Sequence, residues 1–513
     1  MHKTTIWLLL FLAFQTTPGA VSGQDKSARA DRSPGSPERQ GIRSETLDSL
    51  LLFLQNTHQN IHHLSIIRND RMILRTDIYP YSSRHLHDLA SVTKSITSLL
   101  VGIAIDKGFI RDEHVRVLSF FPEIGRYDRR LDSLRIKDLL TMTSGFACGV
   151  IDGEKALSDM RKSGDWVKFI FSLPVTSEPG TKFSYCSCNY YLLGEILARS
   201  SRLTPHAFAK KYLFAPLGIQ SSKWLANSKG INHGWGDLFL FPSDMAKIGK
   251  LVLDKGRWKG RQVIPAPWIT KSLRTFSQLP DDKGYGYGWW TNDKVGYYEA
   301  AGRGRQTISV IPSRKMVVIM LGGEFDAGTV GSYIFRSIGS DSSLPENKTG
   351  LAKLTKRVND IAKAAAVPAA ADTPADLCAT IRPLLDGKTI LFEKNISSID
   401  SMQLHFLSST GGSLSFYKGA GKEKYPFALS RERYAISMDP TLQLPVALQA
   451  ICERNEGAGS SDRPDTGTLI LHYNQLCRIN NFYFHFKVGE QGITTTLEET
   501  SNFIKTPIYS SIR

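Results

Sequence analysis

The hydrophobic and polar positions between residues 45 and 340 follow two periods, one helical and one extended. Apolar residues at helical spacing predict helices over 47–54, 91–107, 190–199 and 205–213. Alternating or β-branched runs predict strands over 61–67, 71–79, 288–290, 306–311 and 316–321. Because strands occur at both ends of this region with helices between them, the pattern predicts one α+β unit whose terminal strands share a sheet.

The pattern changes after this unit. A helix and an Ala/Pro-rich linker are predicted over 342–376, and short alternating runs dominate from there to the end of the sequence. The run 482–488 alternates phenylalanines with polar residues, which is typical of a half-buried strand with an aromatic inner face. We therefore expect a small antiparallel β domain over 377–513. It contains no visible catalytic constellation, and the sequence does not define its role.

The first 23 residues are typical of a secretory signal peptide. Lys3 precedes a short apolar run over 6–14, and Pro-Gly-Ala at 18–20 supplies small residues near a cleavage site. That run is too short to span a bilayer, and no later run reaches transmembrane length. We therefore expect an exported protein, periplasmic or secreted, with no transmembrane anchor in the mature chain. A polar, disordered and basic lead-in is expected over 24–43.

Composition narrows the class of protein. Among 513 residues, 41% are hydrophobic and 22% charged, which excludes a disordered or collagen-like chain. The length exceeds that of one ordinary domain, so two domains are expected. The formal net charge of +16 suits a nucleic acid, an anionic lipid or wall polymer, or simply a positive solvated surface. Export argues against nucleic acid, and part of the charge lies in the lead-in.

Six cysteines fall into two groups of three: Cys148, Cys186 and Cys188, then Cys378, Cys452 and Cys477. An exported protein can oxidise them, and six cysteines permit fifteen pairings. Our hypothesis is one disulfide within each group, which leaves two free thiols. The Cys-x-Cys spacing in the first group is too close for a zinc or thioredoxin-like site, so no metal is expected.

Ser91 and Lys94 open the predicted helix 91–107, where residues at i and i+3 share a face. Free N–H groups and the positive dipole end near a helix N-terminus suit a nucleophile whose attack creates an oxyanion. An amine among apolar residues is favoured in its neutral form, which can act as a base. On spacing alone, a helix-capping serine with a snorkelling lysine is the better explanation. The same spacing at Ser415 and Lys418 falls in a predicted strand, where the two side chains face opposite ways.

Four segments in chain order resemble the serine β-lactamase and penicillin-binding superfamily, in particular its class C β-lactamase-related branch. They read HLHDLASVTKSITSLLVGIAIDKGF (85–109), LLTMTSG (139–145), EPGTKFSYCS followed by YYLLG (178–194), and GYGYGWW followed by GRGRQ (284–306). The resemblance covers about 45–340. It implies a β-lactamase/transpeptidase-like domain over 44–341, with an antiparallel sheet flanked by helices.

The resemblance also implies a role for each matching residue. Ser91 is expected to be the acylated nucleophile, with Lys94 as its base or proton shuttle. Tyr185 carries a phenol that can take or return the proton beside an ammonium group. Ser187 is expected to contact the substrate.

The oxyanion hole would combine the Ser91 amide with a second amide in the segment Gly302, Arg303 and Gly304. This sequence departs from the family pattern in two ways. Ser187 stands where the Tyr-x-Asn motif has an amide side chain, and the usual Lys-Thr-Gly or His-x-Gly triplet is replaced by Gly-Arg-Gly. A guanidinium does not replace an ammonium without consequence, so efficient β-lactamase activity is not expected.

The pattern is most similar to the branch that contains 6-aminohexanoate-dimer hydrolases and carboxylesterases. We therefore expect an exported serine hydrolase that acts through an acyl-enzyme on small ester, amide or peptide-like substrates. No cofactor is expected, and cell-wall polymer is a further candidate partner. One alternative is a peptidoglycan D,D-carboxypeptidase or class C-like β-lactamase. The other is a non-catalytic binding or sensor protein on the same fold.

Overall fold

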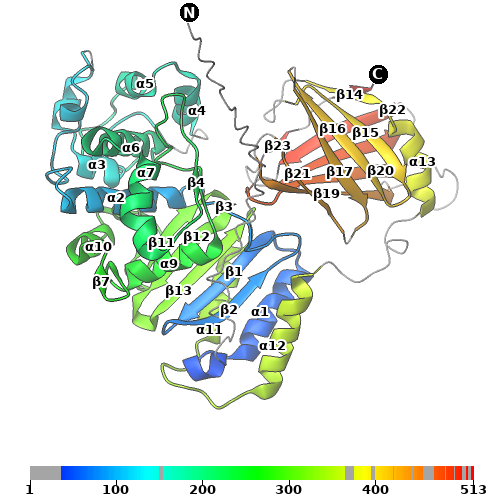
Figure 1. Cartoon of the computed structure of the whole chain (residues 1–513), viewed down its shortest axis with the longest axis horizontal. Helices are drawn as coiled ribbons and strands as arrows, with labels where there is room; N and C mark the ends of the chain where they lie inside the picture. Colours follow the sequence, from blue (N-terminus) through cyan, green and yellow to red (C-terminus); the bar gives the residue numbers. More distant parts are fainter. Residues whose placement is uncertain are drawn as a thin grey trace, which may run out of the picture.

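The computed structural model comprises an N-terminal α+β domain and a C-terminal β domain (Figure 1). It describes residues 36–125, 127–149, 154–363, 375–393, 399–419, 421–431, 433–440, 443–454, 467–479, 481–489, 492–499, 504–506 and 510–512. The signal peptide expected over 1–23 lies outside the described residues. None of the helices in the described ranges has the length and hydropathy needed to cross a bilayer.

An eight-stranded antiparallel sheet forms the centre of the first domain, in the order β2-β1-β13-β12-β11-β10-β9-β8. In that order its strands are Arg71–Asp77, Ile61–Arg68, Met316–Gly322, Gln306–Ile311, Tyr297–Gly302, Trp290–Asn292, Gly284–Tyr285 and Ser277–Gln278. Strands from the two ends of the domain are neighbours, because β1 pairs with β13 and places His63 opposite Leu321. The predicted sharing of one sheet by the terminal strands is confirmed.

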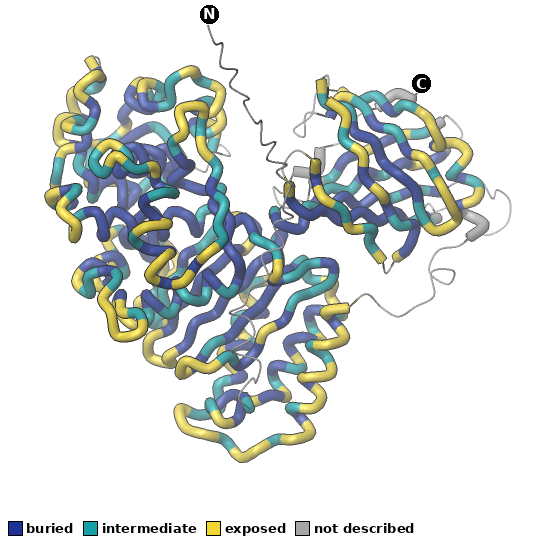
Figure 2. The backbone as a smooth tube through the Cα atoms, viewed as in Figure 1, coloured by how far each residue is buried: buried dark blue, intermediate teal, exposed yellow. Residues whose placement is uncertain are grey.

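Both faces of this sheet are covered, and the alternation along β13 shows it. Val317 and Ile319 belong to one apolar core, while Met316 and Val318 belong to the other. The first core packs beneath helices α2 (Val92–Asp106), α6 (Ser187–Ser201) and α9 (Pro242–Leu253). The second lies against α1 (Ser44–Asn56), α11 (Ala327–Ser337) and α12 (Lys348–Ile361). Figure 2 shows the sheet as a buried layer between these helices.

Shorter elements complete the first domain. A three-stranded sheet pairs β3 with β5 and β5 with β4, over His87–Asp88, Leu238–Leu240 and Lys223–Trp224. β6 (Arg257–Trp258) and β7 (Arg261–Gln262) form a small hairpin. The remaining helices are α3 (Ile136–Leu140), α4 (Lys155–Lys162), α5 (Trp166–Ser172), α7 (Pro205–Ala209), α8 (Ala215–Leu217) and α10 (Ala266–Ser272), with a π-helical turn over Lys210–Phe214.

Two expected segment boundaries move. The lead-in predicted as disordered over 24–43 is ordered from residue 36, where Pro37–Gln40 forms a 3-10 helix. Glu38 is buried there because its carboxylate accepts the Ser44 amide at 3.0 Å, and Ile42 bridges to Ile338. Helix α12, predicted within a linker segment, packs against α1 and therefore belongs to the first domain.

The second domain begins with α13 (Ala375–Leu385), which the sequence did not predict. Its sheet has the order β23-β22-β21-β20-β19-β17-β16-β15-β14-β24, with β18 paired to β19. From β14 to β24 the strands are Thr389–Phe392, Ser401–Ser408, Gly411–Lys418, Gly421–Leu429, Ala435–Met438, Pro445–Arg454, Gly467–Gln475, Asn481–Gly489, Gly492–Glu499, Ile504–Thr506 and Ser510–Ile512. All pairs are antiparallel except the short contact of β17 with β19, which confirms an antiparallel β domain.

The cysteines pair as hypothesised, one disulfide in each group of three. Cys148 is bonded to Cys186, and Cys378 on α13 is bonded to Cys452 on β19. The third cysteine of each group is a buried free thiol.

Candidate active site

Ser91 stands at the tight turn between β3 and α2. The preceding residue, Ala90, has a φ of +45°, which is uncommon for a residue with a side chain. Its amide donates to the Asp88 carboxylate at 2.9 Å, so the turn is held by the last residue of β3. The turn places Ser91 directly before the first residue of α2, at the positive end of the helix dipole.

Lys94 contacts Ser91 from one helical turn further along α2. Its Nζ donates to Ser91 Oγ at 2.7 Å and to the Trp235 carbonyl at 3.1 Å. The lysine is only 1% exposed, so it does not snorkel to solvent. Ser91 makes no side-chain capping hydrogen bond with the helix. Both observations exclude the capping explanation and leave a half-buried serine bonded to a buried lysine.

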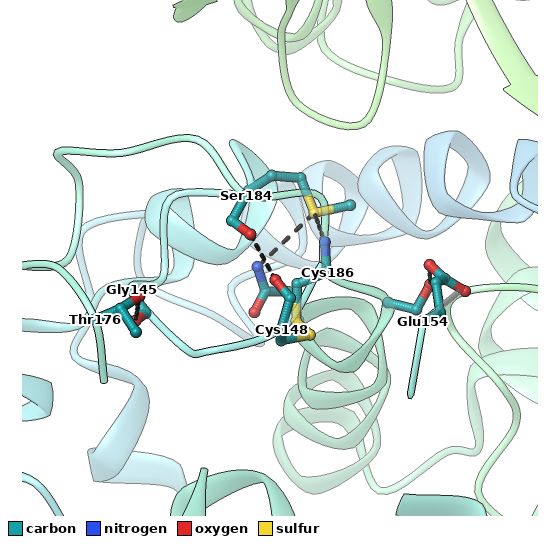
Figure 3. Close-up of a disulfide and its surroundings, with 9 residues drawn as sticks. Gly145, Cys148, Glu154, Thr176, Ser184 and Cys186 are labelled. Carbon is teal, nitrogen blue, oxygen red and sulfur yellow. Dashed lines mark hydrogen bonds between the residues drawn. A yellow bond between two sulfur atoms is a disulfide. The ribbon is translucent and has the colours of Figure 1, made fainter. Parts of the chain in front are cut away.

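Tyr185 approaches this pair with the face of its ring. Lys94 Nζ lies 4.8 Å from the ring centroid, and the ring stacks on Trp290 at 5.8 Å. The next residue, Cys186, is tied by its disulfide to Cys148, and the Ser184 hydroxyl donates to the Cys148 carbonyl (Figure 3). The residues before and after Tyr185 are therefore both anchored to Cys148.

Ser187 is buried at the start of α6, and its hydroxyl donates to Glu154 Oε1 at 2.6 Å. Glu154 has a φ of +58° and lies directly before α4. It lines an open cavity of about 370 Å³ with Leu157, Ser158, Arg161 and Lys162. Sequence analysis did not identify Glu154, because no motif contains it.

The three residues of the expected oxyanion segment are placed differently. Gly302 ends β11 against the nucleophile turn: a Cβ there would lie 2.6 Å from the Leu89 carbonyl oxygen and 2.9 Å from the Ser91 amide nitrogen. Gly304, with a φ of +75°, is directed away from Ser91 toward Ile479 of the second domain. Arg303 lies in the turn between them. Of the three residues, Gly302 has the backbone that lies against Ser91.

Charged groups beside the nucleophile turn form a compact cluster. Burial and the neighbouring Asp237 raise the pKa of Asp88 to about 6, against the opposing effects of Arg478 and Arg303. Burial acts to raise the pKa of Asp237, but its hydrogen bond with His233 Nδ1 at 2.7 Å and the charges of nearby groups lower that pKa overall. His233 stacks on Trp235, the residue whose carbonyl accepts from the lysine.

Two further features bear on what the site can bind. Arg305, a candidate cation from the Gly-Arg-Gly region, is engaged with Glu324, 2.7 Å from Nε to Oε1. The sulfur atoms of Cys148, Cys186 and Cys188 lie within 4.8 Å of one another, a spacing compatible with a metal ion. Two of these sulfurs are joined in a disulfide, so they are not available as thiolate ligands in this state.

The antiparallel sheet with helices on both faces, together with a hydrogen-bonded serine–lysine pair at a helix start, defines the class of β-lactamase-like serine hydrolase folds. A family model described as Beta-lactamase matches residues 63–324, and the chain belongs to this family.

The chain is also similar to individual known proteins at low sequence identity. The chain is 23% identical over 332 residues to a 6-aminohexanoate-dimer hydrolase from Paenarthrobacter ureafaciens, which covers 59% of this chain and 83% of that protein. It is 27% identical over 148 residues to a D-aminopeptidase from Cereibacter sphaeroides, 28% of this chain and 27% of that one. The solved structure of EstCE1, a hydrolase with promiscuous acyltransferase activity, superposes with a TM-score of 0.49 and 12% identity, covering 58% of this chain and 99% of that chain.

Proposed function

We propose that this protein is a serine hydrolase that forms an acyl-enzyme at Ser91 on small ester or amide substrates. The observation that carries the proposal is the hydrogen bond of 2.7 Å between Nζ of the buried Lys94 and Oγ of the half-buried Ser91. A hydroxyl becomes a useful nucleophile when a neighbouring base takes its proton, and the pair has the distance that this transfer requires.

In the proposed reaction, Ser91 Oγ attacks the substrate carbonyl carbon and its proton passes to Lys94. The negative charge that develops on the carbonyl oxygen is stabilised by the Ser91 amide and by an amide at the end of β11 near Gly302. The proton then passes to the leaving alcohol or amine, with Tyr185 beside the ammonium as a second group in the transfer. Water adds to the acyl-enzyme along the same route in reverse and releases the acid.

Small esters and amides are the proposed substrates for two reasons. The names of the similar proteins include an amide-dimer hydrolase and a D-aminopeptidase. This chain also departs from the β-lactamase pattern at the two positions expected to bind the substrate. Ser187, which stands in place of an amide side chain, is bonded to Glu154, and the candidate cation Arg305 is paired with Glu324. Peptide-like substrates and cell-wall polymer remain within the proposal as larger amides. Export of the protein is proposed on the pattern of residues 1–23 alone.

The proposal is tested by labelling with a fluorophosphonate probe, which reacts with activated serines. The wild-type chain should be labelled at one site, and Ser91→Ala should abolish the labelling. Ser415→Ala is the matched control, because Ser415 has the same Ser-x-x-Lys spacing but lies in β16. Folded wild-type protein that takes up no label would refute the proposal.

An activity panel then separates the candidate functions. Short-chain p-nitrophenyl esters, D-amino-acid amides, linear amide oligomers and a chromogenic cephalosporin should be compared on the wild type and Ser91→Ala. Ester or amide turnover that depends on Ser91 supports the proposal. Preferential turnover of the cephalosporin would favour a β-lactamase, and no turnover of any substrate would favour a non-catalytic protein.

A further inference from the structure

The second domain contacts the nucleophile turn directly. We call residues 476–479, which connect β20 to β21, the clamp turn. Its Cys477 carbonyl accepts the Asp88 amide at 2.8 Å, so the clamp turn adds to the free edge of β3, three residues before Ser91. The turn is itself held by hydrogen bonds from the Leu476 amide to Pro445 and from the Arg478 amide to Gln475. In Figure 1, β3 lies where the second domain meets the first.

Apolar side chains of the two domains pack together at this junction. Cys477 and Leu444 of the second domain form a small core with Phe239 of β5, all three less than 10% exposed. Ile479 packs onto Gly304, where an added Cβ would lie 2.3 Å from the isoleucine Cγ2. The clamp turn therefore packs against β5, the neighbour of β3, and against the turn that follows β11.

Arg478 places a positive charge in this junction. Its guanidinium lies over the Phe239 ring at 5.6 Å, beside the carboxylates of Asp88 and Asp237, and it acts on both of them electrostatically. Its Nε is buried and has no hydrogen-bond partner in the described part of the chain. Two carboxylates buried together cannot both stay ionised at low cost unless a cation compensates them.

We propose that the clamp turn is part of the hydrolase site and that Arg478 is a positioning residue, which acts on Ser91 through Asp88. The ionised Asp88 accepts the Ala90 amide and so holds the turn that presents Ser91. Protonation of Asp88 weakens this charge-assisted hydrogen bond, and the strained φ of Ala90 can then relax. The inference rests on the proposed function for its kinetic readout.

The groups that face Asp88 come from every element around it. Asp237 lies directly before β5, Arg303 lies in the turn after β11, and Arg478 lies in the clamp turn. His87 beside it stays neutral, since burial lowers its pKa to about 4, and burial raises the pKa of the Cys477 thiol to about 12. Burial and Asp237 favour the protonated form of Asp88. Arg478 and Arg303 are the cations that oppose them and favour the ionised form.

The test uses the full-length chain with Arg478→Ala, Arg478→Lys and, as a matched control, Arg431→Ala. Arg431 forms a partly exposed ion pair with Glu453 inside the second domain, 3.1 Å apart. For ester hydrolysis, Arg478→Ala should lower kcat at pH 7 about 10-fold with little change in KM. The acidic midpoint of its pH profile should rise by about one pH unit, because a nearby cation has been removed. Arg478→Lys should restore both, and Arg431→Ala should match the wild type.

Hydrogen exchange supplies a readout that does not need catalysis. In Arg478→Ala the Ala90 amide should exchange at least tenfold faster than in the wild type, while amides of β13 stay protected. An unchanged pH profile with unchanged exchange, failure of lysine to rescue, or an equal effect of Arg431→Ala would overturn the inference. If the wild-type protein shows neither esterase activity nor labelling at Ser91, only the proposed function is refuted. The hydrogen-exchange rate of the Ala90 amide would then still decide the role of the clamp turn.

Discussion

Gly302→Ala adds one methyl group where β11 passes the nucleophile turn. Gly302 has a φ of −134°, which an alanine adopts without strain, so the substitution tests space rather than backbone freedom. The new Cβ would lie 2.6 Å from the Leu89 carbonyl oxygen and 2.9 Å from the Ser91 amide nitrogen. Both obstacles are backbone atoms, so no flexible side chain can move aside.

The size of the effect follows from the distance that must be regained. An ordinary contact begins at 3.4 Å, so the strand and the turn must separate by about 0.8 Å at Leu89. A misplacement of about 1 Å can cost about 100-fold in rate, and loss of one oxyanion donor costs about 100- to 1,000-fold in kcat. We therefore expect kcat to fall at least 100-fold, with about 1–3 kcal/mol of stability lost to overpacking.

The assay is steady-state hydrolysis of a p-nitrophenyl ester together with thermal unfolding followed by circular dichroism. Gly331→Ala in α11 is the matched control, because nothing lies within 4 Å of a Cβ at that position. It should keep full activity and the wild-type melting temperature or slightly more. A folded Gly302→Ala protein with kcat within threefold of the wild type would refute the placement of β11 at the oxyanion.

Acidification should destabilise the chain, since burial lowers the pKa of His87 to about 4 and that of His62 well below its usual 6.5. Both stay neutral when folded but take up protons when unfolded below pH 6.5, so stability falls from there toward pH 4. For His87 the loss between pH 7 and pH 5 is about 2 kcal/mol, set against about 1 kcal/mol gained by Asp88, whose raised pKa favours the folded state on acidification. Urea unfolding at several pH values measures the sum, and rising stability down to pH 5 would contradict it. Replacing Cys148 and Cys186 with serine should cost about 2–4 kcal/mol by opening a 38-residue separation in the unfolded chain. It should also lower kcat, because the segment before α6 loses an anchor, and an unchanged urea midpoint would count against this account.

The parts of the fold that follow a strong local period were predictable. The strand predicted at 306–311 has the observed bounds of β12, and the helix predicted at 91–107 differs from α2 by one residue at each end. The helix is long enough to show its period clearly, and the strand is rich in β-branched residues. β3 and β5 were missed because two or three residues show no period, although they position Ser91.

The serine–lysine pair illustrates where local pattern is decisive and where it is not. Ser91 and Lys94 meet because a helix brings i and i+3 to one face. Ser415 and Lys418 have identical spacing, but the strand buries the serine, which is 2% exposed, and leaves the lysine side chain 37% exposed. The spacing acquires chemical meaning only once the secondary structure is known.

The rest of the site depends on contacts between segments that are far apart in the chain. Glu154 reaches Ser187 from a turn with positive φ, and Cys477 reaches Asp88 from another domain, so no local periodicity marks either residue. Net charge was equally uninformative, because most basic residues are dispersed over the surface. Arg478 differs from them in position rather than in type: it is half-buried between the domains with its Nε enclosed, and it acts on Asp88 and Asp237 beside the nucleophile turn. In this fold a single half-buried cation at the domain junction therefore bears more directly on the proposed chemistry than the whole excess of +16.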